Sequence, residues 1–150
     1  MKFKCVSYFF YSLVVLIHFI SCSPENKYHI LDIDITHLGK EYRDCQQKCI
    51  EYIVMTHPSD SHESRFKDVK LYLESRIQNK DLSKDLTFYK AFFFKESWQM
   101  PVDYNETASF FDNQVVSDHL DDLIVTVTYQ NSVWTYKVKT ENNPDKWIVF

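Results

Sequence analysis

Two histidines stand beside carboxylic acids, and such pairs commonly move protons in catalysis. His119 lies between Asp118 and Asp121, and His62 is followed by Glu63. A serine hydrolase also needs a nucleophile held in a sharp turn, and the serines here stand in no nucleophile elbow. The sequence therefore assigns no catalytic residue. An enzyme that uses a His and Asp pair in a pocket stays open as an alternative to a protein that only binds.

Cys45 and Cys49 are a second candidate site, because two thiols four residues apart could hold a metal. We expect a helix from about Lys40 to Thr56, whose buried stripe would contain both cysteines together with Tyr42, Tyr52 and Ile53. Zinc sites usually pair cysteines on a tight knuckle instead. We therefore predict reduced, unligated core thiols and no metal or other cofactor, with a disulfide or a metal site as the alternatives.

Composition excludes several classes of function. The single glycine, Gly39, excludes the glycine-rich phosphate loops of nucleotide-binding proteins, which need several glycines at fixed spacing. The first 21 residues hold two lysines and no acid, so the remainder carries 15 basic and 21 acidic side chains, a net charge of −6. No run of basic residues is longer than two, so we expect no binding to nucleic acid unless lysines gather on one face.

The N-terminus has the pattern of an export signal. A basic head is followed by an apolar run, Cys5 to Ile20, that is shorter than the ~20 residues of a membrane-spanning helix. Phe19-Ile20-Ser21-Cys22 resembles the lipobox of bacterial lipoproteins, with Phe19 in place of the usual leucine. The resemblance implies lipidation of Cys22 and a membrane-anchored product. Cleavage after Ser23, giving a secreted soluble protein, and an uncleaved anchor are the alternatives.

We expect residues 23–28 to be a tether and residues 29–150 to form a single domain, because 150 residues suffice for only one ordinary core. His29 to Thr36 alternates apolar and acidic residues, as an edge strand does. The segment from Asp60 predicts a second helix with Asp60 as its N-cap and Phe66, Val69, Leu73 and Ile77 inside. Two such helices would form an αα-hairpin.

The C-terminal half predicts strands. Leu86 to Phe94 is dense in aromatic residues and is expected to be a strand, and Ser109 to Val116 is a further candidate strand. Apolar and polar residues alternate from Trp98 to Tyr104, but Pro101 favours an edge strand or a bulge there. Asn105-Glu106-Thr107 is a glycosylation sequon if the host is eukaryotic. Residues 123–129, 133–139 and 146–150 read as a three-stranded meander. We expect Trp134, Tyr136 and Trp147 on the same buried face.

Two family resemblances concern the fold. Gln114-Val115-Val116 resembles the Gln-Val-Val loop of cystatins, which makes a protease inhibitor a minor alternative. Helices followed by the strands at Val125–Tyr129, Trp134–Val138 and Lys146–Val149 are similar to nuclear-transport-factor-two-like domains of small bacterial lipoproteins. That resemblance implies an α+β fold, with an N-terminal helical hairpin packed on a curved antiparallel sheet. It also implies a pocket for a small apolar ligand or a protein partner, lined by Phe88, Phe92, Tyr129, Trp134, Tyr136 and Trp147.

Overall fold

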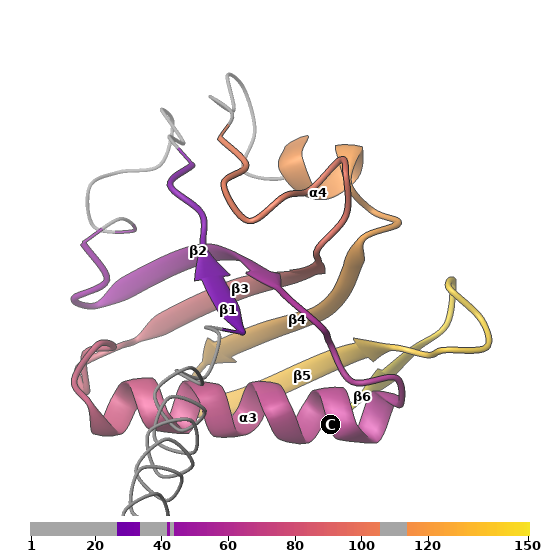
Figure 1. Ribbon diagram of the computed structural model, residues 1–150. Coiled ribbons are helices and arrows are strands. Elements are labelled where there is room, and N and C mark those ends of the chain that lie inside the picture. Colours follow the sequence, from indigo (N-terminus) through magenta and orange to yellow (C-terminus); the bar gives the residue numbers. More distant parts are fainter. Residues whose placement is uncertain (1–26, 34–41, 43, 106–113) are drawn as a thin grey trace, which may run out of the picture.

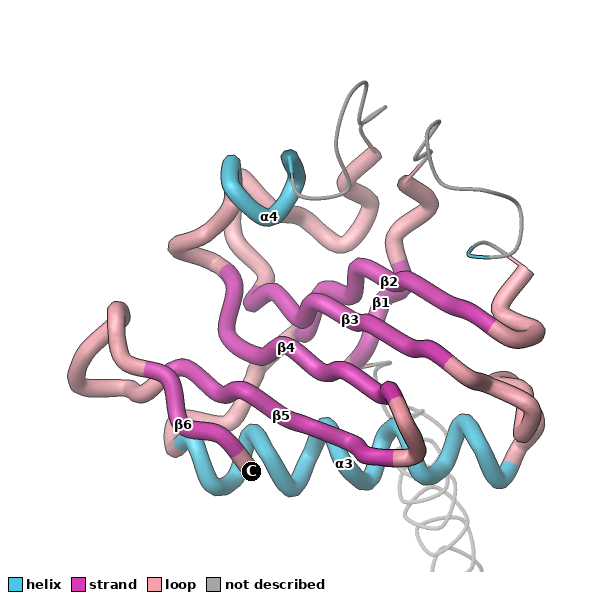
Figure 2. The backbone as a smooth tube through the Cα atoms, turned by 180° about the vertical axis from the view of Figure 1, so that it is seen from behind, coloured by secondary structure: helices cyan, strands magenta, loops and turns pink. Residues whose placement is uncertain are grey.

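The computed structural model describes residues 27–33, 42, 44–105 and 114–150, which form a single six-stranded sheet with two helices (Figure 1). The strands lie side by side in chain order (Figure 2). Their bounds are β1 (Tyr28–Ile30), β2 (Lys48–Met55), β3 (Phe88–Lys95), β4 (Leu123–Gln130), β5 (Val133–Lys139) and β6 (Trp147–Val149). The helices are α3 (His62–Gln78) and α4 (Gln114–Asp118).

The sheet is mixed, so the expected antiparallel sheet with an N-terminal helical hairpin is wrong. β2 and β3 run parallel, with Lys48 opposite Phe88 and Met55 opposite Lys95, and the other neighbours are antiparallel. Parallel neighbours cannot be joined by a hairpin, because the chain must first return to the starting end of the sheet. Helix α3 makes this return, and it is therefore a crossover helix rather than half of a helical pair.

The segment predicted as the first helix forms β2 instead. Its residues from Cys49 to Thr56 are nearly all buried, because β2 is a central strand that is covered on both faces. A strand buried on both faces has a continuous apolar run, which periodicity cannot distinguish from a buried helix. The β-branched and aromatic residues in Cys-Ile-Glu-Tyr-Ile-Val-Met were the signal that favoured a strand.

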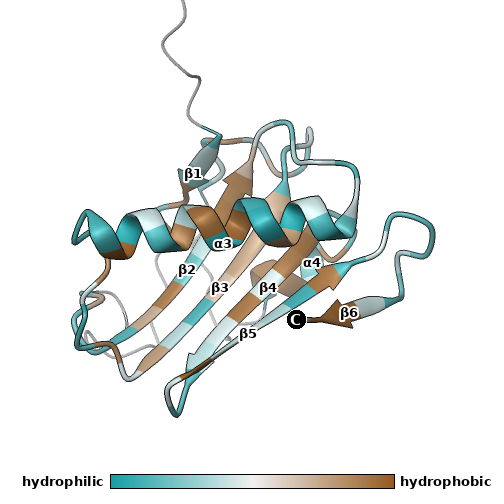
Figure 3. Cartoon of the chain, turned by 90° about the horizontal axis from the view of Figure 1, so that it is seen from below, coloured by the Kyte–Doolittle hydropathy of each residue, from teal (hydrophilic) through white to brown (hydrophobic). Residues whose placement is uncertain are grey.

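Helix α3 confirms the second predicted helix. It begins after Ser61, whose hydroxyl accepts a hydrogen bond from the Ser64 backbone N–H at 3.2 Å, so Ser61 rather than Asp60 is the N-cap. Asn79 caps the other end through its backbone N–H. The buried helix residues are Val69, Leu73 and Arg76, and Figure 3 shows the helix lying across the strands.

The C-terminal meander is confirmed. β4 and β5 pair from Val125 opposite Val138 to Gln130 opposite Val133, and β5 pairs with β6. The turn residues Asn131 and Ser132 both have positive φ, as a two-residue hairpin turn with the twist of the strands requires. The strand expected at Leu86 to Phe94 is also confirmed, as β3.

Trp147 does not share a face with Trp134 and Tyr136, so that expectation is wrong. Trp147 pairs with Lys139, one residue beyond Val138, and successive residues of a strand point to opposite faces. Trp134 and Tyr136 pack against the core on the α3 side, whereas Trp147 packs against the core on the other side. Placing Trp147 required the β5–β6 register, which its own short strand does not reveal.

Each face of the sheet carries its own apolar core. Ile53, Phe93 and Val127 contribute to the core beneath α3. On the opposite face, Phe94 and Leu123 pack with Met100 and with Val115 of α4. Figure 1 shows α3 and α4 on opposite sides of the sheet. The sheet is thus a central layer, and its middle strands are covered on both sides.

Several other expected elements differ. β1 is an edge strand at the expected place, but it ends at Ile30; residues 31–33 are not strand and residues 34–36 lie outside the described part. Residues 114–116 belong to α4 instead of a strand, and Trp98 to Tyr104 is a loop with turns.

The signal, the lipobox and Cys22 precede the described residues. In the described parts of the chain, no helix is both long and apolar enough to cross a bilayer.

The substitution Phe93→Ala should lower the free energy of unfolding by about 3 to 5 kcal/mol, because Phe93 is completely buried in the core beneath α3. Chemical denaturation followed by circular dichroism measures this. Val133→Ala, at a strand position that is 60% exposed, is the matched control and should change it by no more than about 0.5 kcal/mol. Equal losses in both variants would contradict the assignment of the core.

Candidate binding groove

A groove of about 330 Å³ runs between α3 and β5. One wall is a stripe of helix residues, and the other consists of Trp134 and Tyr136 of β5 with Phe150. The helix residues are Phe66, Lys70, Leu73, Glu74 and Ile77. Spacings of three and four residues place them on one side of α3. From Phe66 to Ile77 the helix rises about 16 Å, so the groove follows about three turns of α3.

Aromatic contacts fix the end of the groove where the chain finishes. The rings of Phe66 and Phe150 stack with centroids 4.4 Å apart, and Phe66 meets Tyr136 edge-on at 5.2 Å. Phe150 is held in place because its backbone N–H and C=O both bond to the backbone of Tyr136. Farther along, Trp134 lies 6.4 Å from Tyr136. The walls are therefore rich in aromatic side chains, which suit an apolar or aromatic ligand.

Three of the side chains that line the groove are ionisable: Lys70, Glu74 and Tyr136. Its charged residues Lys70 and Glu74 are half-exposed, with Nζ and Oε1 4.0 Å apart. Burial, and secondarily the charge of Glu74, raises the pKa of Tyr136 to about 12, so the phenol is neutral at physiological pH. The residues that line the groove include no histidine, cysteine or serine. Glu74 is therefore the one carboxylate among the residues that line the groove.

Two of the six aromatic residues predicted to line a pocket, Trp134 and Tyr136, line the groove. Tyr129 lies beside it, with its ring 4.8 Å from that of Trp134. The apolar groove residues missed by the prediction were Phe66, Leu73, Ile77 and Phe150. Helical periodicity placed the first three on the inner face of α3, but it could not show which part of that face the sheet leaves uncovered.

The other three predicted residues, Phe88, Phe92 and Trp147, do not line the groove. Phe92 stacks on Tyr52 with centroids 5.3 Å apart on the opposite face of the sheet. Phe88 meets the ring of Tyr42 edge-on at 6.0 Å. Because side chains alternate along a strand, Phe88 and Phe92 of β3 share one face, and Tyr89 and Phe93 share the face beneath α3.

The histidines singled out in the sequence lie outside the groove lining. His62 bridges two carboxylates: its Nε2 is 2.9 Å from Glu63 and its Nδ1 is 2.9 Å from Glu141. The hydrogen bond from His62 holds the pKa of the Glu141 carboxyl below its usual value. His119 contacts the Tyr104 hydroxyl at 3.0 Å through Nε2, and its buried Nδ1 has no hydrogen-bond partner. His62 thus contacts carboxylates, and His119 contacts a phenol.

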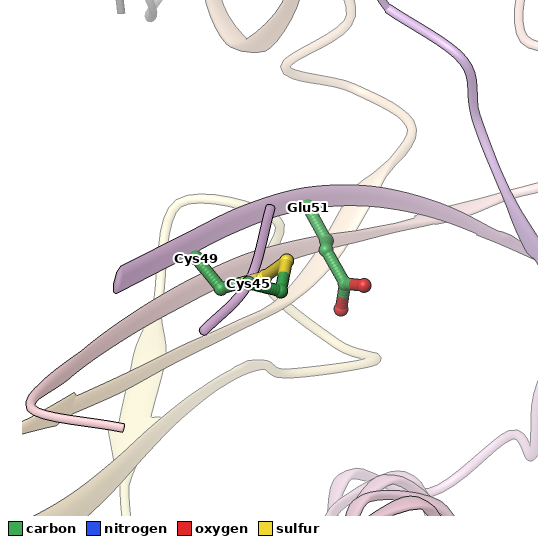
Figure 4. Close-up of side chains that lie close together, drawn as sticks. All are labelled: Cys45, Cys49 and Glu51. Atoms are coloured by element: carbon green, nitrogen blue, oxygen red, sulfur yellow. A yellow bond between two sulfur atoms is a disulfide. The ribbon is translucent and has the colours of Figure 1, made fainter. Parts of the chain in front are cut away.

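Cys45 and Cys49 form a disulfide, so the prediction of two reduced thiols is wrong (Figure 4). The reason is that the segment is not helical. Cys45 has a positive φ just before β2, and this brings the two Cα atoms to 4.4 Å, within the range that a disulfide needs. The sulfurs and the Glu51 carboxylate lie within 4.8 Å of one another, but sulfurs joined in a disulfide are not thiolate ligands for a metal.

Glu51 belongs to a buried polar network between β2 and α3. Arg76 donates to both carboxylate oxygens, at 2.5 and 2.9 Å, and the Tyr89 hydroxyl donates to one of them at 2.7 Å. Burial, and then Glu51, raises the pKa of Tyr89 well above its usual value, so it remains a donor. Burial alone would lower the pKa of Arg76, but the hydrogen bonds and charge of Glu51 raise it above its usual value. The network therefore carries one matched pair of charges.

Comparison of this chain with protein-family models, curated proteins and solved structures finds no match.

Reduction should raise the mass of the peptide that spans residues 45–49 by two hydrogen atoms and make both cysteines available to alkylation. Mass spectrometry of digests prepared under non-reducing and reducing conditions measures this. Cys49→Ser is the matched control, because Cys45 should then be alkylated without reduction. Alkylation of both cysteines in the untreated folded protein would contradict the disulfide.

Arg76→Met should lower the free energy of unfolding by about 3 to 5 kcal/mol, because it leaves the Glu51 charge buried without its partner. Exchanging the whole network for apolar groups, in the triple variant Glu51→Leu, Arg76→Met, Tyr89→Phe, should restore most of this loss. Denaturant titrations of both proteins give the comparison.

The exposed Lys70 and Glu74 pair is the control for this experiment. Lys70→Met should cost only about 0.3 to 0.5 kcal/mol, as is usual for such pairs on a helix surface. If Arg76→Met cost no more than Lys70→Met, the buried network would not hold α3 on the sheet.

Proposed function

We propose that this protein is an exported, membrane-tethered, non-catalytic binding domain, and that its ligand site is the groove between α3 and β5. The observation that carries the proposal is the lining of the groove: four aromatic side chains, from Phe66, Trp134, Tyr136 and Phe150, surround a space of about 330 Å³. A pocket dominated by aromatic and aliphatic side chains with few polar groups is the usual form of a small-molecule site.

The shape of the groove favours a small elongated ligand over a flat protein interface. Its volume lies at the lower end of the range for ligand sites, and a stable protein interface covers roughly 800 Å² on each partner. The apolar side chains of the two walls, among them Leu73 and Trp134, would bind the body of the ligand. Lys70 and Glu74 at the rim could contact a polar end.

Export is supported by two independent features. The N-terminal sequence has a basic head, an apolar run and Cys22 in a lipobox-like setting. The Cys45–Cys49 disulfide fits the same compartment, because disulfides persist in oxidising environments and are rare in the cytosol. The tether to a membrane rests on Cys22, and its direct test is fractionation. Cys22→Ser should move the protein to the soluble fraction or leave its precursor unprocessed.

Binding in the groove can be tested with N-phenyl-1-naphthylamine, an uncharged aromatic probe that fluoresces in apolar surroundings. Trp134→Ala removes a wall of the groove and should weaken binding tenfold or more, equivalent to about 1.4 kcal/mol. Val133→Ala is the matched control, since Val133 is exposed and points to the other face of β5.

Lys70→Gln should change the affinity for this uncharged probe less than twofold, because Lys70 is half-exposed at the rim and the probe has no charge to pair with it. Circular dichroism establishes that each variant keeps its fold, since unfolded chains also bind such probes. Equal affinities for wild type and a folded Trp134→Ala variant would place the ligand elsewhere.

A further inference from the structure

We infer that Trp98 and Leu120 form a membrane-contacting tip that inserts into the interfacial layer of the bilayer to which Cys22 tethers the domain. The inference rests on the tether in the proposed function and adds a second membrane contact, made by the folded domain itself. It is independent of the groove. Trp98 is 88% exposed and Leu120 is 54% exposed, whereas the neighbouring Met100 is fully buried.

The turn that carries Trp98 is pre-organised. The Ser97 hydroxyl accepts hydrogen bonds from the backbone N–H groups of Gln99 and Met100, at 3.2 and 3.0 Å. The Ser97 backbone N–H in turn donates to the Met100 carbonyl. Met100 anchors the turn in the core on the α4 side of the sheet. The turn therefore holds Trp98 exposed to solvent in a fixed position. This reduces the conformational entropy that is lost when Trp98 inserts into the bilayer interface.

A hydrogen bond joins this turn to the one that carries Leu120. The Ser97 hydroxyl donates to the Asp122 carboxylate at 2.8 Å. Ser97 immediately precedes Trp98 in the chain, and Asp122 follows Leu120 by two residues. The second turn is fixed as well, because the Lys139 ammonium donates to the Leu120 carbonyl at 3.0 Å. The two exposed apolar side chains thus belong to adjoining, braced turns at one end of the sheet.

The chain enters the domain at that same end. The Lys27 carbonyl accepts from the Thr56 backbone N–H, and the Glu96 N–H donates to the Met55 carbonyl, so Lys27 and Glu96 flank the end of β2. Two strand spacings separate them, about 10 Å. The five residues from Cys22 to Lys27 can span at most about 17 Å. A lipid on Cys22 therefore brings the Trp98 end of the domain, rather than the opposite end, to the bilayer.

The side chains suit a bilayer interface. Tryptophan concentrates in the interfacial layer because its ring is apolar and its indole N–H is a donor. The exposed residues around the two turns carry both signs, with Lys95 against Glu96, Asp118 and Asp121. The contact should therefore form on a zwitterionic surface and should not require anionic lipid.

Quenching of tryptophan fluorescence by brominated lipid tests the inference. The wild-type protein with its Cys22 lipid is reconstituted in phosphatidylcholine vesicles with and without brominated acyl chains. Bromine should quench the wild type, and Trp98→Phe should lose most of that quenching. Trp134→Phe and Trp147→Phe should keep it, because both rings are half-buried in the domain.

A second pair of variants distinguishes a membrane contact at the tip from nonspecific binding through any exposed apolar side chain. Leu120→Ala should reduce the quenching of Trp98, whereas Leu71→Ala should not, although Leu71 on α3 is 64% exposed. If wild type sediments with the vesicles but Trp98→Phe is quenched as strongly, the tip does not touch lipid and the inference is overturned while the tether stands. If the wild type does not sediment with the vesicles, the tether itself fails and the inference fails with it.

Discussion

The ion pair between Glu51 and Arg76 fixes the position of α3, and much of the remaining architecture depends on that position. Apolar burial is non-directional and would tolerate a helix that slides or turns on the sheet. A two-pronged bond between a guanidinium and a carboxylate has a defined geometry, and here it joins the middle of β2 to the last turns of α3. The Tyr89 hydroxyl extends the constraint to β3. The helix is thereby fixed to both strands that it connects.

This position also explains where the groove lies. Arg76 holds the C-terminal end of α3 over β2, while the N-terminal half reaches β5, where Arg65 donates to the Lys139 carbonyl and Phe66 meets Tyr136. The helix therefore crosses the sheet, and the groove lies along the side of the helix that faces β5. Trp134 is left half-buried, and Phe150 closes one end of the gap by stacking on Phe66. The groove is thus a consequence of a six-stranded sheet that is wider than the single helix covering this face.

The sequence predicted the helices and strands that have one buried and one solvent-exposed face, because their apolar and polar residues then repeat in a regular pattern. In β5 the exposed Lys137 lies between the buried Tyr136 and Val138, and α3 has a cap and a clear stripe, so both elements were recognised. β2 was misread because burial on both faces removes the alternation that identifies a strand. That one error also produced the wrong state of Cys45 and Cys49, since their expected separation assumed a helix. Phe88 and Phe92 were placed on the wrong face because β3 has aromatic residues on both faces, and Trp147 because the register of β6 could not be predicted.

The parallel pairing of β2 with β3 also has a consequence for the order of folding. Lys48 meets Phe88 only after a connection of some forty residues has been ordered, whereas the β4–β5 hairpin closes through a two-residue turn. Contacts between distant residues form more slowly than local ones, because the chain entropy of the long loop is lost before the contacts stabilise it. We therefore expect the C-terminal hairpin to form first and β2 to dock late. On such a route the exposed edge of β3 would be the segment most open to mispairing with other chains while the protein folds.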